Sequence, residues 1–296
     1  MIHTRKDIET LTPARGFFVG IDSDGCAFPT MEVKHKECFI PNTVKHWKLQ
    51  PVSRFAREAA EFVNLYSKWR GINRFPALIM VLDLLAERPE VTRAVKLPDI
   101  ESLRAWTKRE TTLGNATLKA ELARSGDPLL ARVLAWSEGV NASVEDMVVG
   151  VPPFPGVRES LERLAASADI MVVSATPGEA LEREWKEHGI DRYVRIIAGQ
   201  ELGSKKEHLA MAAAGKYPKD HVLMIGDAPG DMAAARANGA LFLPINPGSE
   251  EESWQRFFDE GMDRFLRGTF AGDYEKKLVA DFEKLLPDTP PWKKRA

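Results

Sequence analysis

The chain has 296 residues, of which 44% are hydrophobic and 28% charged, a composition typical of a folded protein rather than a disordered one. Its 41 basic and 43 acidic residues nearly cancel, so we expect no overall attraction to nucleic acid or to a membrane surface. Two cysteines are too few for a disulfide framework, and no apolar run is long enough for a signal or a bilayer span, which favours a cytoplasmic protein. The length predicts about two domains.

Short apolar runs that end in polar or glycine-rich turns predict strands buried on both faces. They are residues 16–21, 170–173, 194–198, 222–225 and 240–243. Helical patterns separate the last four runs, and Ser204 with Glu207 forms a capping box at the start of one of these helices. This alternation predicts a Rossmann-like, three-layer α/β/α core around a parallel sheet.

Residues 26–150 show a different sequence pattern, in which apolar residues recur at helical spacing and strand-like alternation is almost absent. We therefore expect two domains: a discontinuous core over 1–25 and 151–296, and an all-helical insert over 26–150. The insert is predicted to hold helices near 55–66, 75–87, 99–110, 115–124, 128–138 and 143–149. Beyond the sheet we expect helices at about 254–266 and 274–286, followed by a proline-rich, frayed end over 287–296.

Reactive and charged side chains follow four of the predicted strands. The first strand offers Asp22 and Asp24, the second Ser174 with Thr176 close by, the third a Lys205–Lys206 pair at a helix start, and the fourth Asp227 and Asp231. The carboxyl ends of parallel strands meet at one edge of a sheet. Several carboxylates there require a cation, and an all-oxygen set beside a substrate phosphate suits Mg²⁺. The pattern predicts a phosphoryl-transfer site.

The order and spacing of these stretches resemble the haloacid dehalogenase (HAD) superfamily of phosphohydrolases. The stretches are Val19-Gly-Ile-Asp-Ser-Asp-Gly25, Met171-Val-Val-Ser174, the Lys205–Lys206 pair and Ile225-Gly-Asp-Ala-Pro-Gly-Asp231. The helical insert after the first motif resembles the type-1 (C1) cap of that superfamily. In that superfamily, an acid two residues after the nucleophile, here Asp24 after Asp22, goes with phosphatases and phosphomutases, and we expect the phosphatase branch.

The resemblance implies a role for each matching residue. Asp22 would be the nucleophile that forms an aspartyl-phosphate, and Asp24 the general acid and base. Ser174 would bind a phosphate oxygen, and a lysine would neutralise charge; we favour Lys205, and Lys206 remains an open alternative. Mg²⁺ would be held by Asp22, by the backbone carbonyl of Asp24 and by Asp227, with Asp231 as a further ligand or as an orienting residue.

Four further residues are candidates for substrate binding. Thr176 lies near Ser174, and Lys34 closely follows the first motif. Arg70 and Arg74 lie in Trp69-Arg-Gly-Ile-Asn-Arg-Phe75, whose arginines, amide and aromatics could hold an anionic or sugar-like group. A solvated linker and a solvated interhelical loop remain open alternatives for Lys34 and the two arginines.

The resulting hypothesis is a Mg²⁺-dependent phosphatase acting on a small phosphorylated metabolite. A phosphomutase of the β-phosphoglucomutase type shares the same core and stays open. So does a non-catalytic, phosphate-binding or regulatory module on this fold. The oligomeric state cannot be predicted from the sequence.

Overall fold

The computed structural model describes residues 3–295 and divides the chain into two compact units. We name them the α/β unit and the helical unit, and describe each by itself. The α/β unit comprises Met1–Met31 and Gly150–Leu286, and the helical unit comprises Glu32–Val149 and Pro287–Ala296. Residues 26–31, which we expected in the insert, group with the α/β unit because Cys26, Ala27 and Phe28 are buried in its core.

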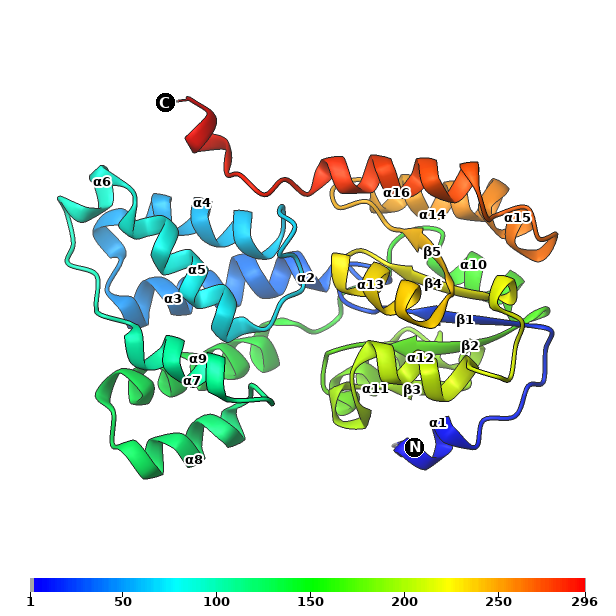
Figure 1. Cartoon of the computed structure of the whole chain (residues 1–296), viewed down its shortest axis with the longest axis horizontal. Helices are drawn as coiled ribbons and strands as arrows, with labels where there is room; N and C mark the ends of the chain where they lie inside the picture. The colour runs from blue at the N-terminus through cyan, green and yellow to red at the C-terminus, as the bar shows by residue number, and fades with distance from the viewer. Residues whose placement is uncertain (1–2, 296) are drawn as a thin grey trace. The chain divides into compact units, whose positions relative to one another are not determined.

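The α/β unit is built on a five-stranded sheet in the order β3-β2-β1-β4-β5, in which all neighbours are parallel. The strands are β1 (Phe17–Ile21), β2 (Ala168–Val173), β3 (Ile196–Ala198), β4 (Val222–Gly226) and β5 (Leu241–Pro244). Central β1 pairs with both β2 and β4, so that Val19 lies opposite Ile170 on one side and Leu223 on the other. The sheet and its helices confirm the predicted Rossmann-like α/β class (Figure 1).

Helices cover both faces of this sheet, because alternate strand residues point to opposite sides. Val19 and Ile21 pack in one cluster with α10 (Val157–Leu164), α11 (Gly178–Glu187), α14 (Glu250–Arg256) and α15 (Met262–Leu266). Phe18 and Met171 pack in the other cluster with α1 (Arg5–Glu9), α12 (Lys205–Ala213), α13 (Pro229–Asn238) and α16 (Asp273–Leu285). The helix expected over 254–266 is α14 and α15 joined by a π-helical turn, Phe257–Gly261.

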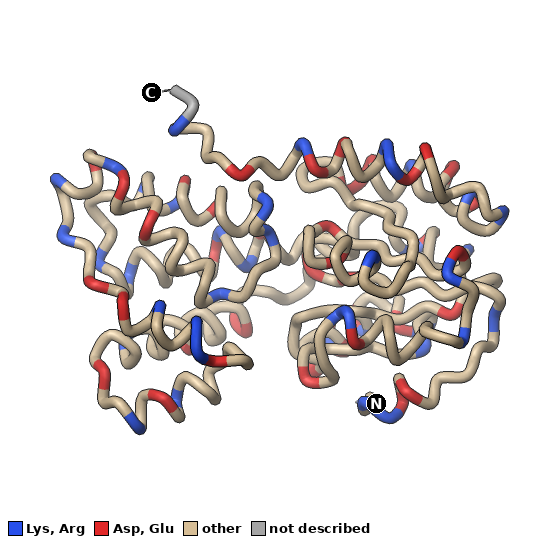
Figure 2. Tube along the Cα trace, viewed as in Figure 1, with Lys and Arg blue, Asp and Glu red and all other residues tan. Residues whose placement is uncertain are grey.

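The helical unit has its own core, in which Trp106 and Trp136 are buried. Its helices are α2 (Thr30–Val33, which starts in the α/β unit), α3 (Ile40–Trp47), α4 (Ser53–Asn64), α5 (Arg74–Ala86), α6 (Pro89–Thr92), α7 (Glu101–Arg109), α8 (Asn115–Ser125) and α9 (Pro128–Met147). Basic and acidic residues are interspersed along the chain in both units (Figure 2). Within residues 3–295 no helix combines the length and the apolar character needed to cross a bilayer.

One long helix, α9, replaces the two short helices predicted over 128–138 and 143–149. Gly139 lies where the break was expected, but the helix continues through it. A Cβ at this position would come within 2.8 Å of the Asn42 side chain and 3.2 Å of His46, both on α3. The glycine therefore serves the close approach of two helices and does not interrupt one.

The C-terminal segment differs from the frayed end that we expected. It forms a short 3₁₀-helix, Pro291–Arg295, within the helical unit. The Trp292 ring packs edge-on at 5.8 Å from the Phe62 ring, and the Arg88 guanidinium lies 4.7 Å from the Trp292 ring centre. One aromatic side chain thus anchors a segment whose proline and lysine content alone favours fraying.

Candidate active site

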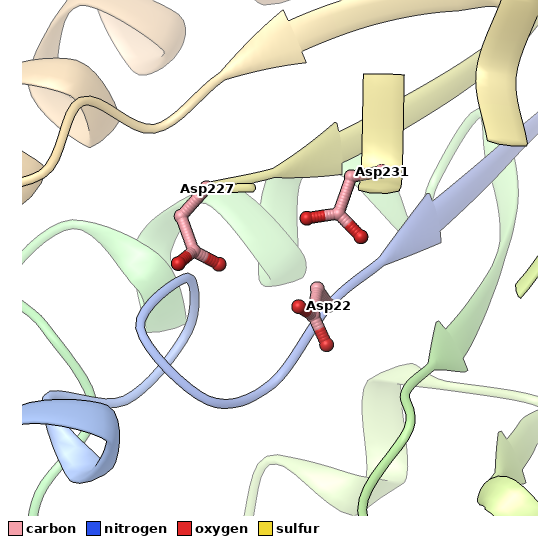
Figure 3. A group of neighbouring side chains, drawn as sticks. All are labelled: Asp22, Asp227 and Asp231. Atoms are coloured by element: carbon pink, nitrogen blue, oxygen red, sulfur yellow. The ribbon is translucent and has the colours of Figure 1, made fainter. Parts of the chain in front are cut away.

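Three carboxylates meet at the carboxyl edge of the sheet in the α/β unit (Figure 3). Asp22 directly follows β1 and Asp227 directly follows the neighbouring β4, while Asp231 lies in the first turn of α13. One oxygen from each carboxylate lies within 4.8 Å of the others. All three side chains are buried, with exposed fractions of 5% for Asp22 and 0% for the other two.

Backbone geometry holds Asp231 against the end of β4. Its carboxylate accepts a hydrogen bond from the Ala228 amide at 3.0 Å, and so it caps α13. A Cβ at position 226 would collide with the Asp231 side chain, and only glycine leaves room there. Asp231 therefore both caps a helix and completes the carboxylate cluster.

The Lys205 ammonium joins two of these acids. Its Nζ lies 2.6 Å from an Asp22 oxygen and 2.6 Å from an Asp231 oxygen. Lys205 is the first residue of α12, and the predicted capping box between Ser204 and Glu207 is present there. Lys206, one residue on, is exposed. Helical geometry directs only the first lysine of the pair into the cluster.

The charges and the burial of the cluster together set the pKa values of its members. Burial raises the pKa of the Asp22 carboxyl to about 6; the Lys205 ammonium opposes this shift, and the Asp231 carboxylate adds to it. Burial also raises the pKa of Asp231. Burial alone would lower the pKa of Lys205, but the two carboxylates raise it, so the ammonium stays charged. One ammonium offsets one carboxylate, which leaves negative charge for a cation to balance.

Asp24 lies in the turn that follows β1, and two threonine hydroxyls hold its carboxylate. Thr30 donates to one oxygen at 2.5 Å, and Thr176, from the loop after β2, donates to the other at 2.6 Å. Gly25 permits the turn, with φ at 78°. Thr176, which the sequence suggested as a substrate-binding residue, thus forms a hydrogen bond to Asp24.

Ser174 directly follows β2, the strand next to β1, and is buried. Its amide donates to the Ala198 carbonyl at 3.0 Å, and its hydroxyl accepts from the Thr176 amide at 3.3 Å. The sheet order β2-β1-β4 therefore brings the ends that carry Ser174, Asp22 and Asp227 side by side.

The family model described as haloacid dehalogenase-like hydrolase matches residues 89–245, more than half of the chain. The chain belongs to the haloacid dehalogenase-like hydrolase family. This result confirms the superfamily that the motifs indicated. The matched range includes Ser174, Lys205, Asp227 and Asp231, whereas β1 and Asp22 precede it.

Solved structures of other hydrolases are similar over most of their length. One is a haloacid dehalogenase-like family hydrolase from Streptococcus pneumoniae, with 17% identity and a TM-score of 0.47, covering 90% of this chain and 98% of the other. Another is a predicted phosphoglycolate phosphatase from Haemophilus somnus, with 15% identity and a TM-score of 0.47, covering 79% of this chain and 88% of the other. Among curated proteins, no relative matches the sequence.

The remaining predicted site residues of this hydrolase belong to the helical unit. Arg70 is buried and donates to the Leu65 carbonyl at 2.8 Å. The Arg74 guanidinium donates to Ser137 and Asn141 and lies 5.0 Å from the Phe39 ring centre. The alternative that both arginines are solvated residues of an interhelical loop is therefore wrong, because each donates to neighbouring groups of the helical unit. Lys34 is half-buried in a π-helical turn, Lys34–Phe39.

Some residues that hold the hydrolase site together were not predicted. Thr30 reaches Asp24 from α2, and the Trp254 indole donates to the Cys26 carbonyl at 2.8 Å, which fixes the turn after β1 from α14. Thr30 lies only six positions after Asp24, so a search for hydroxyls near the motif could have found it. No local pattern indicates Trp254, because 228 residues separate it from its partner.

Proposed function

We propose that the protein is a Mg²⁺-dependent phosphohydrolase that acts on a small phosphorylated metabolite through an aspartyl-phosphate. The observation that carries this proposal is the buried cluster of three carboxylates at the carboxyl edge of the sheet, two of which are paired with the Lys205 ammonium. A nucleophilic carboxylate must be ionised, and the Lys205 ammonium favours that form of Asp22 near neutral pH.

In the first step of the proposed reaction, an Asp22 oxygen attacks the phosphorus and the ester P–O bond breaks. Asp24 gives its proton to the departing oxygen. In the second step, water attacks the phosphorus of the aspartyl-phosphate, Asp24 takes a proton from that water, and phosphate leaves with Asp22 restored. The hydroxyls of Thr30 and Thr176, which can accept as well as donate, suit a carboxyl group that alternates between two protonation states.

The donor set at the cluster fits a divalent cation. It consists only of carboxylate oxygens, which Mg²⁺ prefers, and a cation would lower the cost of keeping three buried acids ionised. We assign the metal site to Asp22, Asp227 and the Asp24 carbonyl, with Asp231 as a further ligand or as an orienting group. A bound cation would balance the negative charge of the phosphoryl group and of these carboxylates.

Two neighbouring groups complete the proposed phosphoryl site. Lys205 would balance charge on Asp22 and on the transferring group, and the Ser174 hydroxyl would bind a phosphate oxygen. In this proposal the α/β unit is the catalytic core and the helical unit is a type-1 cap. Because caps of this type resemble lids that exclude large substrates, we expect activity on small phosphate esters rather than on phosphoproteins.

The test compares turnover of p-nitrophenyl phosphate by the wild type, Asp22→Asn and the control variant Asp220→Asn, each with Mg²⁺ or with EDTA. Asp220 is exposed in the same unit. We expect turnover only with Mg²⁺, at equal rates for the wild type and Asp220→Asn, and a loss of at least about 10³-fold in Asp22→Asn. Equal rates for Asp22→Asn and the wild type would contradict the mechanism.

A further inference from the structure

Ser23, between Asp22 and Asp24, is completely buried and bonded through every polar group it has. Its amide donates to an Asp22 oxygen at 2.7 Å. Its carbonyl accepts from the amides of Ala27 at 2.9 Å and Phe28 at 3.0 Å, which closes the turn after β1. A rotation of the Ser23 peptide would therefore move the Asp22 carboxylate and the whole turn together.

The Ser23 side chain links this turn to α11. Its hydroxyl accepts from the Trp185 indole N–H at 3.0 Å and donates to Glu184 at 3.1 Å. The two partners are consecutive residues of one helix, and Trp185 is also fully buried. Since one partner donates and the other accepts, the hydroxyl has a single orientation in which both bonds form.

The helix that supplies these partners begins just beyond the loop that carries Ser174 and Thr176. That loop already holds Asp24 through Thr176, so α11 is connected to both acids of the first motif. The Phe28 ring packs edge-on against Trp185 with centroids 5.9 Å apart, and this contact limits movement of the indole. The connection is thus rigid from the body of α11 to the backbone of the turn.

We propose that Ser23, Trp185 and Glu184 form a positioning network that fixes the direction of the Asp22 carboxylate for attack. These residues touch no reacting atom; they act through the Ser23 peptide. The network rests on the proposed function of Asp22. A small displacement of a nucleophile can cost about 10²-fold in rate while substrate binding is kept, so the network acts on kcat rather than on KM.

The test measures kcat, KM and thermal stability with p-nitrophenyl phosphate and Mg²⁺ for Ser23→Ala, Trp185→Phe, their double variant, and Ser23→Thr, which restores a hydroxyl. The matched control is Trp136→Phe in the helical unit, which removes a similar buried bond, from Trp136 to the Thr43 hydroxyl at 3.1 Å. Each single variant should lose about 10- to 100-fold in kcat with KM changed less than about threefold. The double variant should lose no more than the worse single one, because both remove the same bond.

The outcomes separate positioning from a structural role. Two results would support the proposal. Ser23→Thr should recover kcat, and Trp136→Phe should keep kcat unchanged although its melting temperature falls about as much as that of the network variants. If the wild type is active and the folded Ser23→Ala and Trp185→Phe variants have the same kcat as the wild type, the positioning proposal is overturned. The proposed function stays intact in that case. If Ser23→Ala does not fold, Trp185→Phe alone decides by the same criterion. A wild type that turns over no phosphate ester would overturn the proposed function and this inference with it.

Discussion

At the scale of single residues, Lys205 is the group on which the charge balance of the site depends. It forms ion pairs with two carboxylates that burial alone would protonate. We predict that Lys205→Met lowers kcat by at least about 10²-fold and, in EDTA at pH 7, lowers the free energy of unfolding by about 3–5 kcal/mol, because buried carboxylates lose their partner. Urea denaturation and turnover measurements check both effects.

The matched control is Lys206→Met, which removes an exposed ammonium one residue away. We expect it to change the unfolding free energy by less than about 0.5 kcal/mol and to leave kcat unchanged. If both lysine variants behaved alike, the assignment of Lys205 to the site would be wrong.

The reactive residues of the site could be predicted from the sequence more fully than the hydrogen bonds that hold them in place. Asp22, Ser174 and Asp227 follow apolar runs, and the geometry of parallel sheets alone places such residues at one edge. The supporting bonds join residues far apart in the chain: 152 positions separate Thr176 from Asp24, and 162 separate Trp185 from Ser23. Such partners leave no periodic signal in the sequence, so they required the folded structure.

At the scale of elements, Asp169 ties the N-terminal segment to β2. Its buried carboxylate accepts from the amides of Ala14 and Arg15, from the Tyr217 hydroxyl and from the Arg195 guanidinium, at 2.8–2.9 Å. Burial alone would raise the pKa of Asp169, but these four donors lower it below its ordinary value. A depressed pKa means that the carboxylate stabilises the fold above its unfolded-state pKa of about 4, and that this stabilisation is lost as the pH falls further.

We therefore predict that Asp169→Asn costs about 2–3 kcal/mol of unfolding free energy at pH 7, because charged hydrogen bonds are replaced by weaker and incomplete ones. The cost should shrink as the pH falls below 4. Denaturation curves at several pH values measure it, with the exposed Asp220→Asn as the control. A cost that is the same at pH 3 and pH 7 would contradict the role assigned to the carboxylate.

The C-terminal segment provides a second prediction at this scale. Trp292→Ala should destabilise the helical unit by about 1–2 kcal/mol, since the indole packs on Phe62 and Arg88. Lys293→Ala removes only an exposed ion pair with Glu87 and should cost less than about 0.5 kcal/mol. Limited proteolysis of the full chain should cut the segment faster in Trp292→Ala alone; equal cutting in both variants would show that the ring does not anchor it.

Two elements differ from the sequence-based expectation for a tertiary reason. We expected two short helices over 128–138 and 143–149, but α9 is continuous, and Gly139 within it allows α3 to approach closely. The proline-rich end suggested fraying, but a single tryptophan finds an aromatic partner in another part of the chain. Local propensity is a weak guide where one contact with a distant element outweighs it.

At the scale of the whole molecule, the fold depends on pairing across a long insertion. The first strand, β1, lies in the middle of the sheet between β2 and β4, although more than 140 residues separate it from β2. The alternation of apolar runs and helices was enough to predict the sheet and the insertion. The strand order, which decides that Ser174, Asp22 and Asp227 are neighbours, is a property of the assembled sheet.

Metal dependence is a prediction about the whole fold, because a cation that binds only the folded state raises the melting temperature. The raised pKa of Asp22, about 6, means that between about pH 4 and 6 this carboxyl binds more protons in the metal-free folded protein than in the unfolded chain. The contribution of Asp22 to stability therefore falls as the pH rises through this range. We expect stabilisation by millimolar Mg²⁺ to be small at pH 4 and to grow to several degrees at pH 7.

Thermal melts with Mg²⁺ or EDTA across this pH range measure the effect, and Asp227→Asn should abolish most of the Mg²⁺-dependent shift. A shift that is independent of pH, or one that persists fully in Asp227→Asn, would contradict the assignment of the cation to this carboxylate cluster.

The proposed aspartyl-phosphate can be detected directly by mass spectrometry of acid-quenched reactions. The wild type, Asp24→Asn and Asp22→Asn are mixed briefly with Mg²⁺ and a small phosphate ester, quenched, and digested to locate any added phosphoryl group. We predict one phosphoryl group on the peptide that contains Asp22 in the wild type, its persistence in Asp24→Asn wherever the first step still proceeds, and its absence in Asp22→Asn. A wild type that releases phosphate while carrying no phosphoryl group at Asp22, or carrying one on another residue, would contradict the account.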